Sequence, residues 1–390
     1  MNAEQLIADV EQDVLTWRRH LHANPELSFQ EHKTADYIVE QLTRFGGLKI
    51  SRPTATSVVA YLQGVAAGPC YALRADIDAL PLQEKNDEPF CSTNPGVMHA
   101  CGHDAHTAML LGAARVLCQM QEQLKGSVCF IFQHAEELPP GGAQELVDLG
   151  YLDDVSMIFG LHVFPTVPTG IVNMKQGIFS AACDNFDIVI QGKGGHGSTP
   201  QHCIDPIVIG AEVATSLQNI VARKIDPLMV PVLSITTFQA GASYNVIPDS
   251  ARLAGTLRTH NREVREKVPQ LVEQTVAGIC QAHGASHKIS WTRGFSSGDN
   301  HPDACAIARQ VVADALGPDA LEEVDTPLFG GEDFSSYQAK RPGCFLFIGC
   351  GNEAIGATHG LHNPYFKLDE AALQVGVKLH VGFIRQLLMR

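Results

Sequence analysis

Cys70-Tyr71-Ala72-Leu73-Arg74-Ala75-Asp76-Ile77-Asp78 is a short, mostly apolar stretch that ends in two carboxylates. Its length and composition predict a buried strand over 70–75, with Asp76 and Asp78 directly after it. The same kind of stretch recurs along the chain and predicts further strands over 57–63, 127–133, 157–161 and 344–349. Near-continuous apolar strands that alternate with helices are typical of α/β proteins with a mainly parallel sheet and helices on both faces. We therefore expect that fold.

Apolar residues at helical spacing predict the helices that connect these strands. Gly46 and Gly47 are expected to end the second helix, and Asp369 is expected to cap the last one. The predicted helices cover 4–22, 30–45, 104–124, 142–150 and 369–388.

The pattern changes after Gly177, where apolar and polar residues begin to alternate with a period of two. The predicted strands lie at 186–191, 230–239, 250–258 and 285–291, with helices over 205–222 and 261–283. This order, β-α-β-β-α-β, is that of the ferredoxin-like unit, although Pro269 is expected to kink or break the second helix. We therefore expect an inserted ferredoxin-like α+β domain at 181–292, and a catalytic domain made of 1–180 and 293–390.

Length and composition restrict the class of protein further. The chain has 390 residues, which exceeds the ~250–300 at which single cores stop growing, so two domains are expected. A net charge of −14 argues against nucleic acid or an anionic membrane as the main partner. No apolar run approaches the ~20 residues that span a bilayer, and no secretory signal is visible at the N-terminus. Eleven scattered cysteines indicate thiols in a reducing compartment, so we expect a cytoplasmic enzyme.

Potential metal ligands follow each predicted strand. In an open parallel sheet, ligands bind beyond the carboxyl ends of the strands. The side chains expected at that edge are Asp76, Asp78, His99, Cys101, His103, His134, Glu136, Glu137, His162, His359 and His362. Each is weak evidence by itself, but the convergence of five loops on one edge indicates a metal site. A thiolate, imidazoles and a carboxylate suit zinc, and also cobalt, nickel or manganese.

The number of donors indicates two ions. Cys101 and His103 have the i, i+2 spacing that places two ligands on one side of an extended segment, and Gly102 lets the backbone approach the ion. Five ligands exceed what one tetrahedral zinc uses, whereas two ions ~3.5–4 Å apart with a shared ligand account for them. One of Glu136 and Glu137 would then bind metal. The other would take a proton from water and pass it to the leaving amine.

Other classes of protein are less well supported. Gly192-Lys193-Gly194-Gly195-His196-Gly197 fits the G-x-G-x-x-G spacing of dinucleotide sites. However, Pro200 follows closely and the next helix starts no earlier than about 205, which leaves no helix N-terminus to hold a pyrophosphate. No G-x-S-x-G elbow follows a strand of the predicted parallel sheet, which disfavours a serine hydrolase. A metal-binding protein without activity would require a lost base or ligand, and none is missing.

Several motifs together resemble one family, the amidohydrolase branch of the dinuclear metallopeptidases. That branch contains hippurate hydrolases, N-acyl-amino-acid amidohydrolases and plant auxin-amide hydrolases. The motifs occur in family order from residue 17 to past 366. They are Arg18-Arg19-His20-Leu21-His22 with Pro25-Glu26-Leu27, Arg74 to Pro81, Met98 to His106, Gln133 to Glu137, Gly160-Leu161-His162, Gly194 to Ser198, Asn245 to Pro248, Gly330 to Phe334, and Leu361 to Pro364.

The resemblance implies hydrolysis of an N-acyl amino acid to a carboxylic acid and a free amino acid. The metal ligands would be Cys101, His103, Glu137, His162 and His362, with Cys101 bridging. Glu136 would be the general base, and Asp78 would orient a ligand imidazole. Cys101 stands where the peptidase relatives use a bridging carboxylate, and Asp76 stands where they place a ligand histidine. A dipeptidase or carboxypeptidase that uses the same site is the alternative.

The resemblance also implies roles for the inserted domain, which in this family dimerises and forms part of the substrate cleft. His196 would reach the scissile carbonyl as an oxyanion donor, in the site of the partner subunit. Asn245 and Arg258 would hold the substrate carboxylate, and Gly331 would also belong to the substrate-binding residues. A homodimer is therefore expected.

Overall fold

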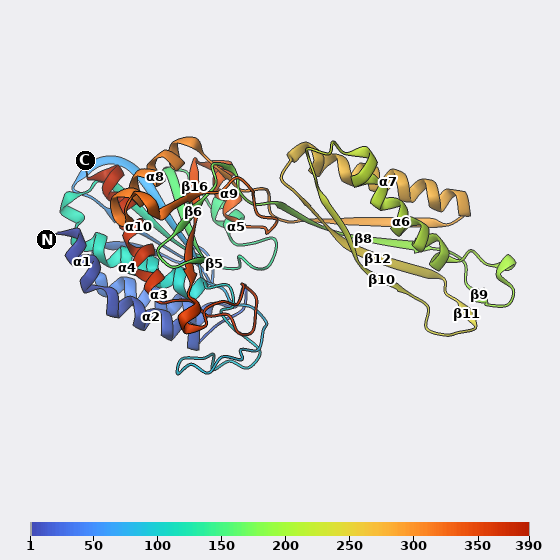
Figure 1. Ribbon diagram of the computed structural model, residues 1–390, viewed down its shortest axis with the longest axis horizontal. Helices are drawn as coiled ribbons and strands as arrows, with labels where there is room; N and C mark the ends of the chain where they lie inside the picture. Colours follow the sequence, from blue (N-terminus) through green and yellow to red (C-terminus); the bar gives the residue numbers. More distant parts are fainter. Residues whose placement is uncertain (1, 390) are drawn as a thin grey trace. The chain divides into compact units, whose positions relative to one another are not determined.

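The strand predicted at 70–75 lies near the middle of an eight-stranded sheet (Figure 1). Its strands, in spatial order, are β1 (Leu48–Ser51), β2 (Val58–Gln63), β4 (Lys125–Gln133), β3 (Ala66–Asp76), β5 (Val155–Pro168), β16 (Gly343–Gly351), β6 (Val172–Met174) and β15 (Leu321–Glu323). The four central neighbours β4, β3, β5 and β16 are all parallel. The predicted mainly parallel α/β sheet is confirmed.

Both faces of this sheet are buried, because successive residues of a strand contribute to different cores. Leu73 of β3 belongs to the larger core, with helices α1, α2, α3, α4, α8 and α10. The preceding residue, Ala72, belongs to a smaller core, which includes residues of α5 and α9. The helices are α1 (Ala3–Asp9), α2 (Glu11–Ala23), α3 (His32–Phe45), α4 (His103–Gln119), α5 (Ala143–Asp148), α8 (Pro302–Leu316), α9 (Phe334–Lys340) and α10 (Ala371–Leu388). This two-sided burial explains why the strands are apolar throughout.

Two helix ends differ from the sequence-based expectation. The helix predicted over 4–22 is divided at Val10, which keeps a helical backbone and donates its N–H to the carbonyl oxygen of Leu6. Asp369 does accept a hydrogen bond from the N–H of Ala371, as a capping residue would. The N-cap position itself is Glu370, whose side chain makes no capping bond.

The computed structural model describes residues 2–389, and they form two units. The sheet belongs to the first unit, which contains the residues up to Phe179, Asp299–Thr326, and those from Asp333 onward. The second unit contains Ser180–Gly298 and Pro327–Glu332. None of the described helices is both long and apolar enough to cross a membrane.

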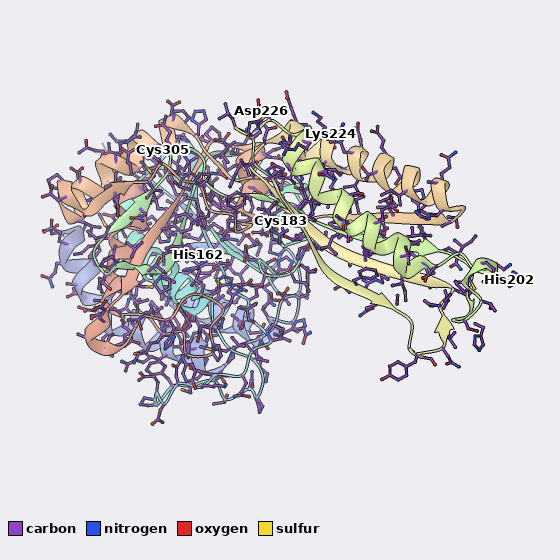
Figure 2. The ribbon with its side chains drawn as sticks, turned by 45° about the vertical axis from the view of Figure 1, so that its right-hand side comes forward. His162, Cys183, His202, Lys224, Asp226 and Cys305 are labelled. Atoms are coloured by element: carbon purple, nitrogen blue, oxygen red, sulfur yellow. The ribbon has the colours of Figure 1, made fainter. Side chains whose placement is uncertain are left out.

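The second unit has a four-stranded antiparallel sheet covered by two helices. Its strands, in spatial order, are β10 (Val232–Ala240), β12 (Ser250–Thr259), β8 (Ala182–Gln191) and β13 (Ser286–Arg293). The helices are α6 (Pro206–Lys224) and α7 (Arg262–His283), and both pack on the sheet. The order of these strands and helices along the chain is the one predicted for the ferredoxin-like unit. Short strands β9 (Gly195–His196) and β11 (Val246–Ile247) pair nearby, and His202 lies in the turn after β9 (Figure 2).

Pro269 does not break α7, which runs without interruption through it. A proline leaves the carbonyl four residues earlier without its helical donor. Here that carbonyl belongs to Arg265, and it accepts a hydrogen bond of 3.3 Å from Nη1 of Arg293. The predicted break is therefore wrong, because a side chain from β13 replaces the missing N–H.

Candidate metal centre

The five ligands expected from the sequence lie together in the first unit. Sγ of Cys101 is 3.4 Å from Nε2 of His162, and Nε2 of His362 is 3.2 Å from Oε1 of Glu137. Nε2 of His103 is 3.9 Å from the same Glu137 oxygen. Donor atoms lie within 4.8 Å of one another in overlapping groups, which include Cys101, His103 and His162; Cys101, Glu137 and His362; and His103, Glu136 and Glu137. Residues that are far apart in the chain therefore share one small volume.

Gly102 fixes the start of α4 between two of these donors. Its φ of 86° lies in the left-handed region, and a Cβ atom built on it would be 2.3 Å from Cγ2 of Val163. The glycine is therefore needed for close packing against Val163 of β5, which is the neighbour of His162. The sequence suggested another reason for a glycine here, namely that the backbone approaches an ion.

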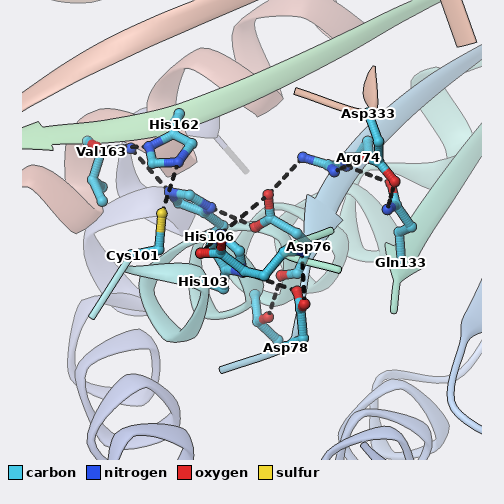
Figure 3. A network of polar contacts seen from close by, with 12 residues as sticks. Arg74, Asp76, Asp78, Cys101, His103, His106, Gln133, His162, Val163 and Asp333 are labelled. Atoms are coloured by element: carbon cyan, nitrogen blue, oxygen red, sulfur yellow. Dashed lines mark hydrogen bonds and ion pairs between the residues drawn. The ribbon is translucent and has the colours of Figure 1, made fainter. Parts of the chain in front are cut away.

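His162 lies inside β5 rather than beyond its end. The sequence predicts that this strand ends at 161, but it continues to Pro168 because its pairing with β16 continues that far. Nδ1 of His162 is 2.7 Å from the carbonyl oxygen of Val163, so the proton is on Nδ1 and Nε2 faces Cys101 (Figure 3). Burial lowers the pKa of His162 well below its usual range. The ring is thus neutral, which is the form that binds metals.

Asp78 connects His103 with the turn that carries Glu136 and Glu137. Its Oδ1 is 3.1 Å from Nδ1 of His103, which leaves Nε2 of His103 directed at the donor cluster. Its Oδ2 accepts hydrogen bonds from Oγ of Ser28 at 2.7 Å and from the backbone N–H of Glu137 at 3.0 Å. A carboxylate that orients a ligand histidine is a common feature of metal sites, and this is the place predicted for Asp78.

Asp76 forms a second buried pair, with His106, a residue for which no role is predicted from the sequence. Oδ1 of Asp76 is 2.5 Å from Nδ1 of His106, and Oδ2 is 2.6 Å from Nη1 of Arg74 (Figure 3). Nε2 of His106 accepts a hydrogen bond of 2.9 Å from the N–H of Val163. His106 thus links α4 to β5 beside His162. The sequence signal that could have identified His106 is its i, i+3 spacing from His103, which places both side chains on one face of a helix.

The same network continues to α9 through Arg74. Nη2 of Arg74 is 2.8 Å from Oδ1 of Asp333, and Nε2 of Gln133 is 2.6 Å from the other oxygen of that carboxylate. Burial raises the pKa of Asp333 to about 6, although Arg74 opposes this. The buried guanidinium holds the ends of β3 and β4 in one arrangement.

The charges at the cluster fit the binding of divalent cations. Burial raises the pKa of the Cys101 thiol well above its usual range, and the carboxylates of Glu137, Glu136 and Asp76 raise it further. Burial alone would lower the pKa of His103, but carboxylates led by Asp76 outweigh it and raise the pKa to about 10. Nε2 of His103 is buried and has no hydrogen-bond partner among the described residues. Cations would supply the missing positive charge, favour the thiolate and engage this nitrogen.

Three further histidines of the expected edge are outside the donor groups found among residues 2–389. His134 pairs with Oε2 of Glu145 at 3.1 Å. His99 is buried and neither of its ring nitrogens has a hydrogen-bond partner. The ring of His359 lies near that of Tyr365.

The four remaining expected site residues lie in the second unit. Nδ1 of His196 accepts hydrogen bonds from the N–H and the hydroxyl of Ser198, so its proton is on Nε2. The carbonyl oxygen of Asn245 accepts from the N–H of Gly197 at 2.8 Å. The guanidinium of Arg258, on β12, contacts Thr256 and the carbonyl oxygen of Leu257. A Cβ atom on Gly331 would be 2.6 Å from Sγ of Cys183.

An α/β unit that gathers a thiol, three imidazoles and paired glutamates at one place defines a metal-dependent hydrolase. The chain matches peptidase family M20/M25/M40 over residues 72–386, and it belongs to that family. Within the family it belongs to the amidohydrolase branch, in agreement with the resemblance seen in the sequence.

Individual relatives support this assignment. The chain is 51% identical to an N-acyl-L-amino acid amidohydrolase of Geobacillus stearothermophilus over 75% of this chain and 79% of the relative. It is 37% identical to thermostable carboxypeptidase 2 of Saccharolobus solfataricus over 96% of this chain and 95% of that relative. A crystal structure of the Bacillus subtilis YXEP protein, described as a dinuclear metal binding peptidase from the M20 family, superposes with a TM-score of 0.83 at 39% identity. It covers 97% of this chain and 98% of that one.

Proposed function

We propose that this enzyme hydrolyses the amide bond of N-acyl amino acids, of the hippurate or N-acetyl-amino-acid type, to a carboxylate and a free amino acid. The observation that carries the proposal is the convergence of Cys101, His103, Glu137, His162 and His362 beside a second glutamate, Glu136. Two divalent ions, zinc, manganese, cobalt or nickel, would be held by these five residues, with Cys101 bridging. When bound, the ions would polarise the amide carbonyl and lower the pKa of a water molecule.

The protein groups then have separate tasks. Glu136 is next to the ligand Glu137, and its donor oxygen shares a 4.8 Å group with His103. In the proposed reaction Glu136 takes a proton from the attacking water and gives it to the leaving amine. Asp78 keeps His103 oriented and holds the peptide N–H of Glu137. The reaction therefore needs no side-chain nucleophile.

The second unit would supply the substrate contacts. The proton on Nε2 of His196 suits it as a donor to the developing oxyanion. Arg258 and Asn245 are assigned to the substrate carboxylate, with Arg258 making a charge-assisted bond, and Gly331 is assigned to the substrate-binding residues.

A homodimer formed through the second unit is part of the proposal. β10 is an edge strand of its sheet, and it exposes Val232 and Phe238. Leu228, Met229 and Val230, just before it, are also exposed. An apolar edge strand is a surface that favours pairing with another copy. His196 would then serve the site of the partner subunit.

A cytoplasmic location is also proposed, because all eleven cysteines are free thiols.

The test is metal analysis of the purified enzyme, followed by assays of amino acid release. We expect about two divalent ions per chain and turnover of benzoyl-glycine or acetyl-amino acids. The relative named as a carboxypeptidase favours a second candidate, in which the same centre cleaves peptides. Turnover of dipeptides or longer peptides above that of every N-acyl amino acid would replace the first proposal with the second.

A further inference from the structure

The segment Ser28–Glu31, between α2 and α3, contacts the turn that carries Glu136 at two points and reaches it at a third through Asp78. Oγ of Ser28 donates to Oδ2 of Asp78 at 2.7 Å. The ring of Phe29 lies edge-on to that of His134, with 5.5 Å between centroids. Oε1 of Glu31 accepts a hydrogen bond of 2.7 Å from the backbone N–H of Ala135.

Ala135 needs such support because its backbone is unusual. Its φ of 51° places a residue other than glycine in the left-handed region, directly before Glu136. Residues in this region are strained, and they persist where the surroundings hold them. Ala135 is fully buried, so the alternative partner for its N–H, solvent water, is excluded.

The side chain of Glu31 bonds to Ala135 and does not cap its own helix, α3. It occupies the N-cap position of α3, where a side chain usually accepts a bond from that helix, yet it makes no capping bond. The side chain is fully buried and reaches across 104 positions of sequence to Ala135. Burial raises its pKa to about 7, but a neutral carboxyl group keeps a carbonyl oxygen that accepts the same bond.

Two carboxyl groups therefore hold the turn on either side of Glu136. Glu31 binds the N–H of Ala135, and Asp78 binds the N–H of Glu137. We infer that Glu31 is a positioning residue, which keeps the strained turn at Ala135 in the conformation that presents Glu136 to the centre. This inference rests on the proposed role of Glu136 as the base.

The test compares Glu31→Met, which removes the acceptor, with Glu31→Gln, which keeps it. Because a displacement of about 1 Å can cost ~100-fold in rate, we expect Glu31→Met to lower kcat by roughly 10- to 100-fold. KM and metal content should stay within about twofold, and Glu31→Gln should keep most of kcat. Adding Ala135→Gly to Glu31→Met should recover part of kcat, because glycine adopts this φ without strain.

Glu26→Met is the matched control, since Oε2 of Glu26 accepts bonds from Thr34 of α3 and does not contact the turn. It should lower thermal stability without lowering kcat. Equal kcat losses in Glu31→Met and Glu31→Gln would overturn the inference. A loss confined to metal content would also overturn the inference.

A readout without substrate separates this inference from the proposed function. Hydrogen exchange of the peptide that contains Ala135 should become faster in Glu31→Met than in the wild type and in Glu26→Met. Unchanged exchange would overturn the role of Glu31 even in an active enzyme. An inactive wild type with this difference in exchange would instead overturn the proposed function and leave the contact established.

Discussion

At the scale of single residues, adjacent side chains have different environments and therefore different expected roles. Glu137 contacts His362 and shares a donor group with Cys101, whereas the donor groups that contain Glu136 include neither Cys101 nor His362. The sequence alone left open which glutamate binds metal. Glu137 is therefore the proposed ligand, which is also what the family resemblance implies.

Glu136→Gln is predicted to abolish most of the activity while metal content is kept. Loss of a general base typically costs roughly 10²–10⁴-fold in rate, the range seen for proton transfer. Glu137→Gln should instead lower the metal content, because it removes a ligand. Metal analysis of both variants beside kcat checks the assignment, and turnover that survives in Glu136→Gln would contradict it.

Gly102→Ala is predicted to destabilise the first unit strongly. The left-handed φ would cost about 1–2 kcal/mol, and overpacking against Val163 would add about 1–3 kcal/mol. Gly96→Ala is a matched control, since Gly96 has a φ of 77° and a Cβ atom placed on it would have nothing within 4 Å. Urea unfolding should show a larger loss for Gly102→Ala, and equal losses would mean that the contact with Val163 is unimportant.

At the scale of helices and strands, a cluster of buried charges joins α2, α4 and the segment after β3. His22 lies 2.8 Å from Asp104 and 3.1 Å from Glu84, and Nε of Arg18 is 2.9 Å from Asp104. Burial and Arg18 lower the pKa of His22, but Asp104 and Glu84 outweigh them and raise it. Burial raises the pKa of Glu84, yet its bonds, led by His22, lower it to about 2.

These shifts predict how stability depends on pH. Glu84 has a folded pKa below its usual 4.5, so its contribution is present above pH 4.5 and is lost as the pH falls toward 2. His22 has a folded pKa above its usual 6.5, so its contribution is present below pH 6.5 and is lost as the pH rises through the folded value. The cluster should therefore stabilise the fold most between about pH 4.5 and 6.5.

His22→Asn is predicted to destabilise the first unit by roughly 3–5 kcal/mol within that range, because it leaves buried charges unpaired. The difference from the wild type should shrink below about pH 4 and at high pH. Trp17 of α2 reports on this unit if Trp291 of the second unit is replaced by Phe in both proteins. Urea unfolding by Trp17 fluorescence across pH gives the measurement, and a pH-independent difference would contradict the prediction.

The elements differ in how far the sequence predicted them. Strands such as β3 and β4 were predicted near their observed positions. Their residues are buried on both faces of the sheet, and such burial gives a continuous apolar stretch that is visible in the sequence. The full length of β5 was missed because it depends on pairing with β16, which follows much later in the chain. The continuity of α7 at Pro269 was missed because it depends on Arg293. The partners of Glu31 and His106 were likewise set by contacts between distant segments, which single-sequence patterns do not record.

At the scale of the whole molecule, metal binding should stabilise one unit more than the other. The proposed ligands all belong to the first unit. A ligand at about 1,000 times its Kd stabilises the state that binds it by about 4 kcal/mol. The unfolding of the second unit should change little.

Chelation is accordingly predicted to abolish turnover and to lower the Tm reported by Trp17, with little change in that reported by Trp291. Zinc, manganese, cobalt and nickel, added separately, should restore both properties to different extents. Single-tryptophan variants, Trp17→Phe and Trp291→Phe, separate the two signals. A chelated enzyme that keeps full turnover would refute the metal-dependent reaction.

The order of the chain also determines when the centre can exist. Cys101, His103, Glu137 and His162 precede the second unit, whereas His362 and the strand β16, which pairs with β5 at His162, follow it. During synthesis the ribosome therefore makes four of the five donors and then the whole of the second unit before the fifth donor. A nascent or truncated chain that stops before β16 lacks both a ligand and the strand that holds His162 in place. The complete centre can therefore form only after the chain has been made as far as His362.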